Sequence, residues 1–240
     1  AELADVSKAT AARLFRSLGY ADFNEVREQS REERNRTEPY RYSQAAPAQP
    51  HLGKSIGSHL ELEISNLTRT FEELSSERLN HAAGLLKEAP KVWFLGLGPE
   101  EGIARLGRLL MARLRHEVMQ IGLHQASWAE DLAMMGPRDA LVAITLRPRP
   151  RVLRPILDYA RTTRVNTILL TDQLSTAWAQ KYAAIVLPCH VASHGLGPSY
   201  TAIASAVRLL AVAFAERAGP RAGERMELIA EIHEELDDTE

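Results

Sequence analysis

The sequence contains a single cysteine, Cys189, among its 240 residues. One cysteine cannot form a disulfide within the chain, and no cysteine cluster could hold a metal ion, so we expect a cytoplasmic protein without a metal site. No apolar run approaches the ~18 residues that a membrane-spanning helix needs. The first residues lack the basic start of a secretory leader. These absences exclude a disulfide scaffold and predict a protein with no membrane partner.

Aromatic residues are also scarce, at 6% of the chain, and the net charge is only −2. Since apolar residues still make up 45% of the sequence, the core must consist mainly of Leu, Ala, Val and Ile. A near-neutral chain is not expected to coat nucleic acid with its whole surface, although a local DNA-reading patch is compatible with this charge. The length suits one sizeable core with a small appendage.

The chain changes character twice along its length. Residues 1–36 are polar, charged and helical in pattern, whereas residues 37–53 contain three prolines and no apolar periodicity. The second stretch is therefore predicted to be a linker. Residues 54–240 are predicted to form the main domain. This domain opens with an apolar helical stripe at three- and four-residue steps, made of Leu60, Ile64, Leu67, Phe71 and Leu74.

Short apolar runs alternate with amphipathic stretches from residue 91 onwards. Strands are predicted at residues 92–95, 118–121, 140–145, 167–171 and 185–187, with helices near 100–115, 125–134, 149–163 and 173–182. This alternation predicts an α/β fold, a five-stranded parallel sheet with helices on both faces. The runs are apolar throughout, as strands buried on both faces should be. Two long helices, at about 199–218 and 222–237, are predicted to close the chain.

The N-terminal segment has features of a DNA-reading helix. Ser7 can cap a helix that leaves Lys8, Thr10 and Arg13 exposed near its N-terminus. Side chains of these types at that position are what a recognition helix offers to the major groove. A plain pair of packed helices is the alternative, and the near balance of acidic and basic residues over 1–42 favours it. Because a helix-turn-helix needs a scaffold helix before the pair, we expect a partial, all-α reader.

The stretch VSKATAARLFRSLGY, residues 6–20, followed by Asp22 and Phe23, resembles the DNA-binding segment of the RpiR family of bacterial transcriptional regulators. The shared spacing is V-S-x-x-T-x-x-R-x-x-x-x-L-G. Members of that family join this reader to a sugar isomerase (SIS) domain that binds phosphosugars, and the second half of this chain is similar to that domain in layout. The resemblance implies a homodimeric or homotetrameric regulator without a cofactor, whose partners are a double-stranded DNA operator and a small-molecule effector.

Candidate ligand-binding residues follow the predicted strands, because ligands of open α/β sheets bind at the carboxyl ends of strands. After the first strand, Gly96 and Gly98 precede a helix whose N-terminus can receive an anion, although glycines there can also serve packing alone. The SIS family usually has a serine after these glycines. Here Pro99, Glu100 and Glu101 follow instead. A carboxylate at Glu100 satisfies the helix dipole itself and repels phosphate.

The loop after the third strand departs from the family in a related way. The family's Ser-x-Ser-Gly-x-Thr signature is replaced, after Thr145, by Leu-Arg-Pro-Arg-Pro-Arg. In one interpretation Arg147 and Arg149, with Arg151, clamp an anion, because arginine binds phosphate or carboxylate through paired hydrogen bonds. In a second, these arginines pair with the two glutamates after the first strand, and the neutralised crevice suits a zwitterionic or weakly charged ligand. In a third interpretation, the arginines are simply exposed to solvent at the start of the next helix.

Further candidates lie after the fourth and fifth strands. Thr171 and Asp172 end the fourth strand, with a hydroxyl and a carboxylate expected near the crevice. His194 and Ser199 belong to the polar loop after the fifth strand, where Ser199 either touches an anion or simply caps the next helix. Cys189 with two nearby histidines would be an incomplete zinc set, so we predict no metal there.

These observations favour a DNA-binding regulator, rather than an enzyme, whose SIS-type domain senses a sugar phosphate or another anionic or zwitterionic metabolite. A sugar-phosphate isomerase of the SIS type is one alternative, and it would need a base such as His194, His233 or Glu234. A non-catalytic dimerisation module is another. The loss of the phosphate-holding hydroxyls and the presence of an N-terminal reader favour the regulator.

Overall fold

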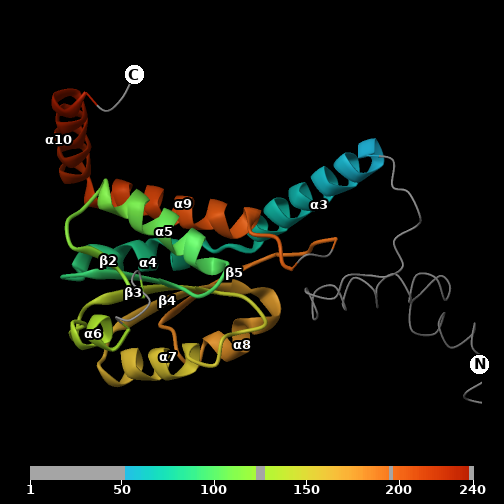
Figure 1. The fold of residues 1–240 in the computed structure, drawn as a ribbon, viewed down its shortest axis with the longest axis horizontal. Coiled ribbons are helices and arrows are strands. Elements are labelled where there is room, and N and C mark those ends of the chain that lie inside the picture. The colour runs from blue at the N-terminus through green and yellow to red at the C-terminus, as the bar shows by residue number, and fades with distance from the viewer. Residues whose placement is uncertain (1–51, 123–127, 195–196, 238–240) are drawn as a thin grey trace, which may run out of the picture. The chain divides into compact units, whose positions relative to one another are not determined.

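The computed structural model describes residues 52–122, 128–194 and 197–237 (Figure 1). The chain divides into two compact units. Of the described residues, one unit contains 52–59, 192–194 and 197–198, and the other contains 60–122, 128–191 and 199–237. The predicted DNA-reading residues Ser7, Lys8, Thr10 and Arg13 lie outside the described residues, as does almost all of the predicted linker.

The larger unit is built on a parallel sheet of five strands. These are β1 (Val92–Gly96), β2 (Val118–Gln120), β3 (Ala140–Thr145), β4 (Asn166–Asp172) and β5 (Ile185–Cys189). Their order across the sheet is β2-β1-β3-β4-β5, and every neighbouring pair is parallel. The chain builds outward from β1 in both directions, so the topological switch point lies between β1 and β3. The predicted α/β fold and its five parallel strands are confirmed.

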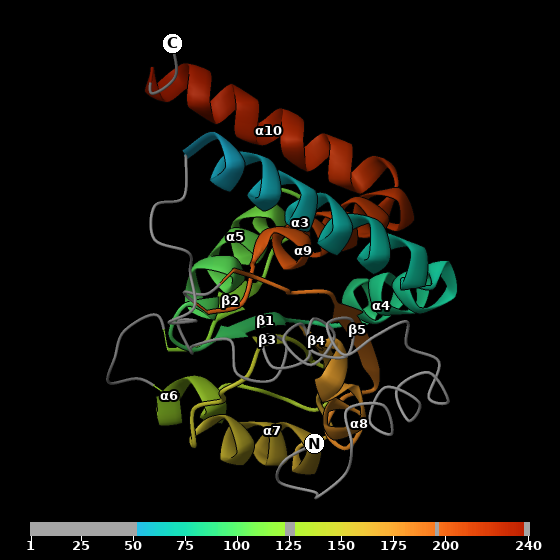
Figure 2. The same ribbon diagram turned by 90° about the vertical axis from the view of Figure 1, so that its right-hand side faces the viewer.

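Helices cover both faces of this sheet. The helices are α3 (Leu52–Glu73), α4 (Ser76–Glu88), α5 (Glu100–Ala112), α6 (Trp128–Ala133), α7 (Leu153–Thr162), α8 (Thr176–Ala179), α9 (Thr201–Ala218) and α10 (Pro220–Leu236), with a 3-10 turn η2 (Gln173–Ser175) before α8. Helices α4, α5 and α9 lie on one face and α6, α7 and α8 on the other (Figures 1 and 2). Of the helices in the described residues, none is both long and apolar enough to cross a membrane.

Ser75 separates α3 from α4 and caps α4, accepting a hydrogen bond from the backbone N–H of Arg78 at 3.4 Å. One helical prediction needed correction. The helix predicted over 173–182 is only the turn η2 and the short α8. In both places local hydroxyl side chains bond to nearby backbone groups and compete with a continuous helix.

The central positions of the strands are apolar because each strand contributes to two cores. Val92 and Phe94 of β1 pack with α4, α5 and α9, whereas Trp93 and Leu95 pack with α7 and α8. Successive strand residues point to opposite faces, so a strand covered on both faces needs an unbroken apolar run. The same covering leaves only the two ends of the strands for polar chemistry.

Helix α10 contributes little to either core. It exposes four large apolar side chains, from 44% to 65%: Met226, Leu228, Ile232 and Leu236. The helix projects from the end of α9 (Figures 1 and 2). Leu228, Ile232 and Leu236 recur at four-residue steps and so share one face of α10, whereas Met226 lies on another. An apolar face of this kind, on a helix with few contacts inside its own chain, is typical of an interaction surface.

Candidate functional site

The carboxyl ends of β1, β3 and β4 bring several predicted site residues to one edge of the sheet. In the strand register Thr145 lies opposite Thr171, and Gly96 lies opposite Ile144, one residue before Thr145. Asp172 follows Thr171 and lies opposite Cys189 of β5. The edge therefore contains the switch point between β1 and β3, together with the loops that carry Glu100, Arg147 and Arg149. We call this region the carboxyl-edge crevice.

The glycines after β1 allow the chain to turn tightly into α5. A Cβ atom on Gly96 would lie 2.2 Å from the carbonyl oxygen of Glu100. Gly98 has a φ of +66°, which side-chain-bearing residues rarely adopt, and its carbonyl accepts the N–H of Glu101 at 3.1 Å. Packing of the first turn of α5 against the end of β1 is therefore enough to explain both glycines.

Replacing Gly96 by alanine is expected to destabilise the protein by about 2 kcal/mol, because the added methyl group meets backbone atoms that cannot rotate away. Urea unfolding of Gly96→Ala measures this loss. Gly102→Ala, on α5 with no atom within 4 Å of the added Cβ, is the matched control and should not lose stability. Equal stability of the two variants would contradict the close approach.

Glu100 places a buried carboxylate at the switch point. Its side chain is on the first turn of α5, and the residue is only 5% exposed. The carboxylate accepts hydrogen bonds from the backbone N–H of Leu146 and from the hydroxyl of Tyr200, the latter at 3.4 Å. Burial raises the pKa of Glu100, and these hydrogen bonds oppose the shift. The N–H after β3 thus already bonds to an acidic group of the chain itself.

Glu100→Gln is expected to raise stability at pH 7 relative to the unchanged protein. Because the pKa of Glu100 is raised from 4.5 in the folded state, folded chains bind more protons than unfolded ones just above that pH, and stability is lost as the pH rises. Glutamine has no such loss, so the advantage of Glu100→Gln should disappear below about pH 4.5. Thermal unfolding between pH 4 and 8 measures the difference in stability between Glu100→Gln and the unchanged protein, and the exposed Glu101→Gln is the control. A pH-independent difference would contradict the assignment.

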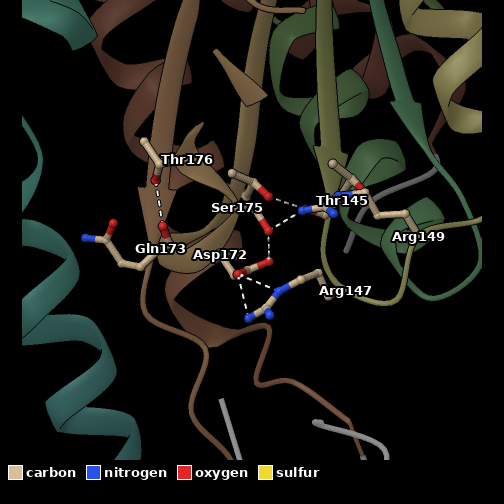
Figure 3. Close-up of polar contacts among 8 residues, drawn as sticks. Thr145, Arg147, Arg149, Asp172, Gln173, Ser175 and Thr176 are labelled. Atoms are coloured by element: carbon tan, nitrogen blue, oxygen red, sulfur yellow. Dashed lines mark hydrogen bonds and ion pairs between the residues drawn. The ribbon is translucent and has the colours of Figure 1, made fainter. Parts of the chain in front are cut away.

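Arg147 and Asp172 form an ion pair across the ends of β3 and β4. Nε and Nη2 of Arg147 each lie 3.0 Å from Oδ1 of Asp172 (Figure 3). Asp172 is 4% exposed, and its other oxygen, Oδ2, accepts the hydroxyl of Ser175 at 2.5 Å. Internal pairing of the loop arginines was one of the predicted alternatives, but the acidic partner is Asp172, on β4, and not the glutamates on α5.

Arg149 extends the same network toward α8. Its Nη2 donates a hydrogen bond to the Ser175 hydroxyl (Figure 3). Its guanidinium lies over the ring of Trp178, 3.9 Å from the ring centroid. Burial lowers the pKa of Arg149, with Asp172 opposing that shift. Its Nε is buried and has no hydrogen-bond partner. Two guanidinium groups thus share one carboxylate, which leaves this cluster with one positive charge in excess.

The threonines at the strand ends are engaged within the sheet. Thr171 is fully buried, and its hydroxyl donates a 2.7 Å hydrogen bond to the carbonyl oxygen of Thr145. Thr145 itself is 3% exposed. Arg151 is exposed. Arg147 and Arg149 are only partly buried, whereas the neighbouring threonines are buried and stabilise the strand ends.

The structure separates His194 from Ser199. His194 lies in the smaller unit, where its Nε2 is 3.1 Å from the carbonyl oxygen of Ser58. Ser199 lies in the larger unit, is 8% exposed, and donates to Oε2 of Glu63 at 2.7 Å. The Ser199 hydroxyl also accepts the backbone N–H of Thr201 at 3.3 Å, at the start of α9. Its hydroxyl therefore has partners on both sides within its own chain.

A second polar cluster connects α3 with the ends of β4 and β5. Nε2 of His190 lies 3.0 Å from Oε1 of Glu73, and the side-chain amide of Gln173 donates to Oε2 of the same carboxylate. The backbone N–H of His190 donates to the hydroxyl of Thr70 at 2.8 Å. Because Gln173 follows Asp172 directly, the ion pair at the crevice is one residue away from a contact with α3.

Cys189 has no nucleophilic or metal-binding role that the geometry supports. The side chain is fully buried, and burial raises the pKa of its thiol to about 12, so the thiolate does not form near neutral pH. Across the described ranges, no group of three His, Cys, Asp or Glu side chains is placed to hold a metal ion.

Sequence reasoning missed several contributors to the crevice. Ser175 and Trp178 complete the arginine network, and Tyr200 contacts Glu100 from α9's N-terminal side. A signal existed for Ser175, because a serine three residues after an aspartate is a common local hydrogen-bonding pair. Nothing in the spacing identified Trp178, since the cation–π contact depends on how the loop after β3 lies against α8.

The family model of the SIS domain matches residues 85–214. A curated relative, the bifunctional protein glk of Paraburkholderia xenovorans, is 27% identical over 177 residues, covering 72% of this chain. The match covers 27% of that relative's length, so the chain spans about a quarter of the curated relatives it resembles.

Two solved structures of regulators have the same fold. The sugar isomerase domain of an RpiR transcription factor from Sphaerobacter thermophilus has a TM-score of 0.68 at 21% identity, covering 73% of this chain and 98% of that one. The Vibrio vulnificus NanR protein, complexed with ManNAc-6P, has a TM-score of 0.66 at 15% identity, covering 96% and 82%. Sugar-phosphate isomerases share the fold too, at TM-scores of 0.53 and 0.56.

Proposed function

Because the chain belongs to the SIS domain family, we propose that it is a transcriptional regulator whose SIS domain binds a carbohydrate derivative at the carboxyl-edge crevice. The observation that carries this proposal is the network at the switch point. Glu100, Asp172, Arg147 and Arg149 are each held by neighbours of the same chain. Groups fixed in this way can recognise a ligand without first being ordered.

The charges of the crevice indicate the class of ligand. A buried carboxylate at Glu100 disfavours a phosphate beside α5, whereas the excess positive charge of the arginine pair favours one anionic group near β3 and β4. A sugar derivative matches both places if its anionic group lies beside the two arginines and an amino or hydroxyl group lies beside Glu100. The likeness to the NanR protein, whose ligand is ManNAc-6P, supports a sugar of this kind.

The contact between the crevice and α3 offers a route from ligand to DNA. α3 connects the larger unit to the residues that precede it, which resemble the RpiR reader. A ligand that competes for Asp172 also displaces the adjacent Gln173, which donates to Glu73 on α3. Regulation follows if the ligand binds one arrangement of this contact better than the other. The exposed apolar side chains of Ile232 and Leu236, toward the C-terminal end of α10, support pairing of two copies, as a two-fold operator would require.

An isomerase is the second candidate, and one observation favours it. Glu100 is a buried carboxylate with a raised pKa at the switch point, and a catalytic base commonly has these properties. Its hydrogen bonds to Leu146 and Tyr200 occupy the carboxylate, which favours a structural role. Incubation with aldose and ketose phosphates distinguishes the two, because conversion that is lost in Glu100→Gln would indicate an enzyme.

Thermal unfolding with a ligand panel, followed by DNA binding, tests the regulator. ManNAc-6P, its unphosphorylated sugar, sugar acids and amino sugars are compared, since a ligand that binds the folded state raises the unfolding temperature. Selection from random duplex DNA, with and without the best ligand, then tests the reader. Binding that is sequence-selective and salt-sensitive, and that the ligand alters, is the expected result. A chain that selects no sequence at low salt would contradict the proposal.

Replacing Glu73 by alanine is expected to uncouple the ligand from DNA. The variant removes the partner of Gln173 and His190 on α3 but leaves Arg147, Arg149 and Asp172 unchanged. Ligand affinity should stay within about twofold, whereas the ligand-induced change in DNA affinity should fall at least fivefold, a loss of about 1 kcal/mol of coupling. Glu72→Ala, an exposed neighbour on the same helix, is the control. Unchanged coupling in Glu73→Ala would exclude this route.

A further inference from the structure

A cavity of about 630 Å³ lies at the opposite end of the strands from the crevice. Its walls come from the C-terminal ends of α4, α5 and α9 and from the first turns of α10, with Pro90 just before β1. Small-molecule sites commonly have volumes of roughly 300–1,000 Å³. We call this space the amino-edge cavity, and neither the SIS match nor the proposed effector accounts for it.

The interior of the amino-edge cavity is apolar. Leu114, Phe214 and Leu228 line it from α5's C-terminal side, α9 and α10. Phe214 belongs to the main core and is 3% exposed, whereas Leu228 is 48% exposed although it lines the cavity. A large apolar side chain that stays half exposed beside a pocket can be covered by an apolar ligand. Burying this apolar surface favours binding.

Cations surround this apolar interior, and the ends of three helices hold most of them. Nζ of Lys87 donates to the carbonyl oxygen of Arg217 at 2.7 Å, at the end of α9. Nε of Arg225 donates to the carbonyl oxygen of Ala112 at 2.8 Å, at the end of α5. Nη2 of Arg115 donates to the carbonyl oxygens of Ala89 and Pro90, at 2.9 and 2.8 Å, after α4. Such contacts fix the side chains before any ligand arrives.

Few carboxylates lie among these cations, although Glu117 and Asp139 act electrostatically on Arg115. Lys87, Arg115, Arg221 and Arg225 line the cavity together with only two acidic residues, Glu117 and Glu224. Within the described residues, no carboxylate forms an ion pair with any of the four cations. Helix ends carry only partial charges, about half an electron each. Arg221 is exposed, and the hydrogen bonds of Arg225 to other described residues use its Nε and Nη1, so Arg221 and the Nη2 of Arg225 can serve as donors to an anion.

We propose that the amino-edge cavity binds an amphiphilic anion, an apolar chain or ring that carries one carboxylate. The apolar body lies against Leu114, Phe214 and Leu228, and the carboxylate pairs with Arg221 and Arg225 at the rim. The site is separate from the carboxyl-edge crevice, because the whole length of the sheet lies between them. The protein therefore has a second ligand site for a different chemical class.

Calorimetric titration of the whole chain with three probes tests this site. Decanoate supplies both an apolar chain and a carboxylate, decyltrimethylammonium has the chain with the opposite charge, and acetate has the charge without the chain. We expect decanoate to bind one per chain, with an affinity at least tenfold higher than that of either other probe. Equal affinity for decanoate and decyltrimethylammonium would overturn the proposal, because the cations would then make no contribution.

Variants locate the binding. Arg221→Glu reverses one exposed rim charge, and Leu228→Ser removes part of the apolar wall; each should weaken decanoate binding about tenfold. Arg154→Glu, the same charge reversal on α7 at the other face of the sheet, should leave the affinity unchanged. Circular dichroism establishes that each variant is folded. Decanoate affinity retained in both Arg221→Glu and Leu228→Ser would place the binding elsewhere and overturn the proposal.

Discussion

Replacing Asp172 by alanine should lower the free energy of unfolding by about 3 kcal/mol, the effect of removing one member of a buried ion pair. The carboxylate is 5% exposed and is bonded to Arg147 and Ser175, so its loss leaves the Arg147 guanidinium and the Ser175 hydroxyl without this partner. Arg149, which reaches the carboxylate through Ser175, loses the opposite charge that offsets its burial. Urea unfolding measures the change.

Asp158 provides a matched control for this experiment. It also pairs with two arginines, Arg154 at 3.8 Å and Arg161 at 2.9 Å, but on the surface of α7, where its side chain is 39% exposed. Exposed ion pairs contribute roughly 0–1 kcal/mol to stability. The free energy of unfolding of Asp158→Ala should therefore fall by less than about 1 kcal/mol. A loss in Asp172→Ala no larger than in Asp158→Ala would contradict a buried network at the crevice.

Small anions should restore part of the stability that Asp172→Ala loses. The vacated space lies between a guanidinium and a hydroxyl that previously contacted Asp172, and formate or acetate can offer the same two oxygens. We expect the unfolding temperature of Asp172→Ala to rise with formate concentration more steeply than that of the unchanged protein. If the unfolding temperature rose equally with formate concentration in both proteins, the arginines would have found other partners within the chain.

The second large effect concerns ligand choice, where Glu100→Ser should raise the affinity for ManNAc-6P between tenfold and a hundredfold. Like charges about 4 Å apart repel by several kcal/mol at an effective dielectric constant near 20, and tenfold in affinity needs only about 1.4 kcal/mol. The substitution removes that repulsion, together with the carboxylate that accepts the N–H of Leu146, so this N–H can donate to a phosphate oxygen. Calorimetric titration measures the affinity.

Glu101→Ser is the control for Glu100→Ser, since it makes the same change on the same helical turn at an exposed position. The unphosphorylated sugar provides a second comparison, because its affinity should not rise. If Glu101→Ser raises the affinity for ManNAc-6P as much as Glu100→Ser does, the increase comes from the change in net charge alone. Glu100 would then not determine the class of ligand.

The fold could be predicted from the sequence because its signals are local. Each strand is a short apolar run, and each crossover helix has its own apolar period, so the parallel α/β sheet follows from patterns within a few residues. The strand predicted over 140–145 matches β3 residue for residue. Helix ends were harder, since they depend on single capping contacts such as that of Ser75.

The crevice was predicted in outline but not in its pairings. The strand ends identified Glu100, Arg147, Arg149 and Asp172 as neighbours, because position at the carboxyl edge follows from the parallel fold. Which carboxylate meets which arginine depends on loop geometry: β1 and β4 both lie beside β3, and the loop after β3 places Arg147 against Asp172 of β4. The amino-edge cavity had no sequence signal, since its walls come from segments far apart in the chain.

The order of the strands also limits how two copies of this chain can associate. One edge of the sheet is β2, with only three residues, and the other is β5, with five. Edges this short offer a neighbouring molecule few backbone groups with which to pair. Extension of the sheet into a second molecule is therefore disfavoured, and exposed helices such as α10 are the surfaces better suited to association.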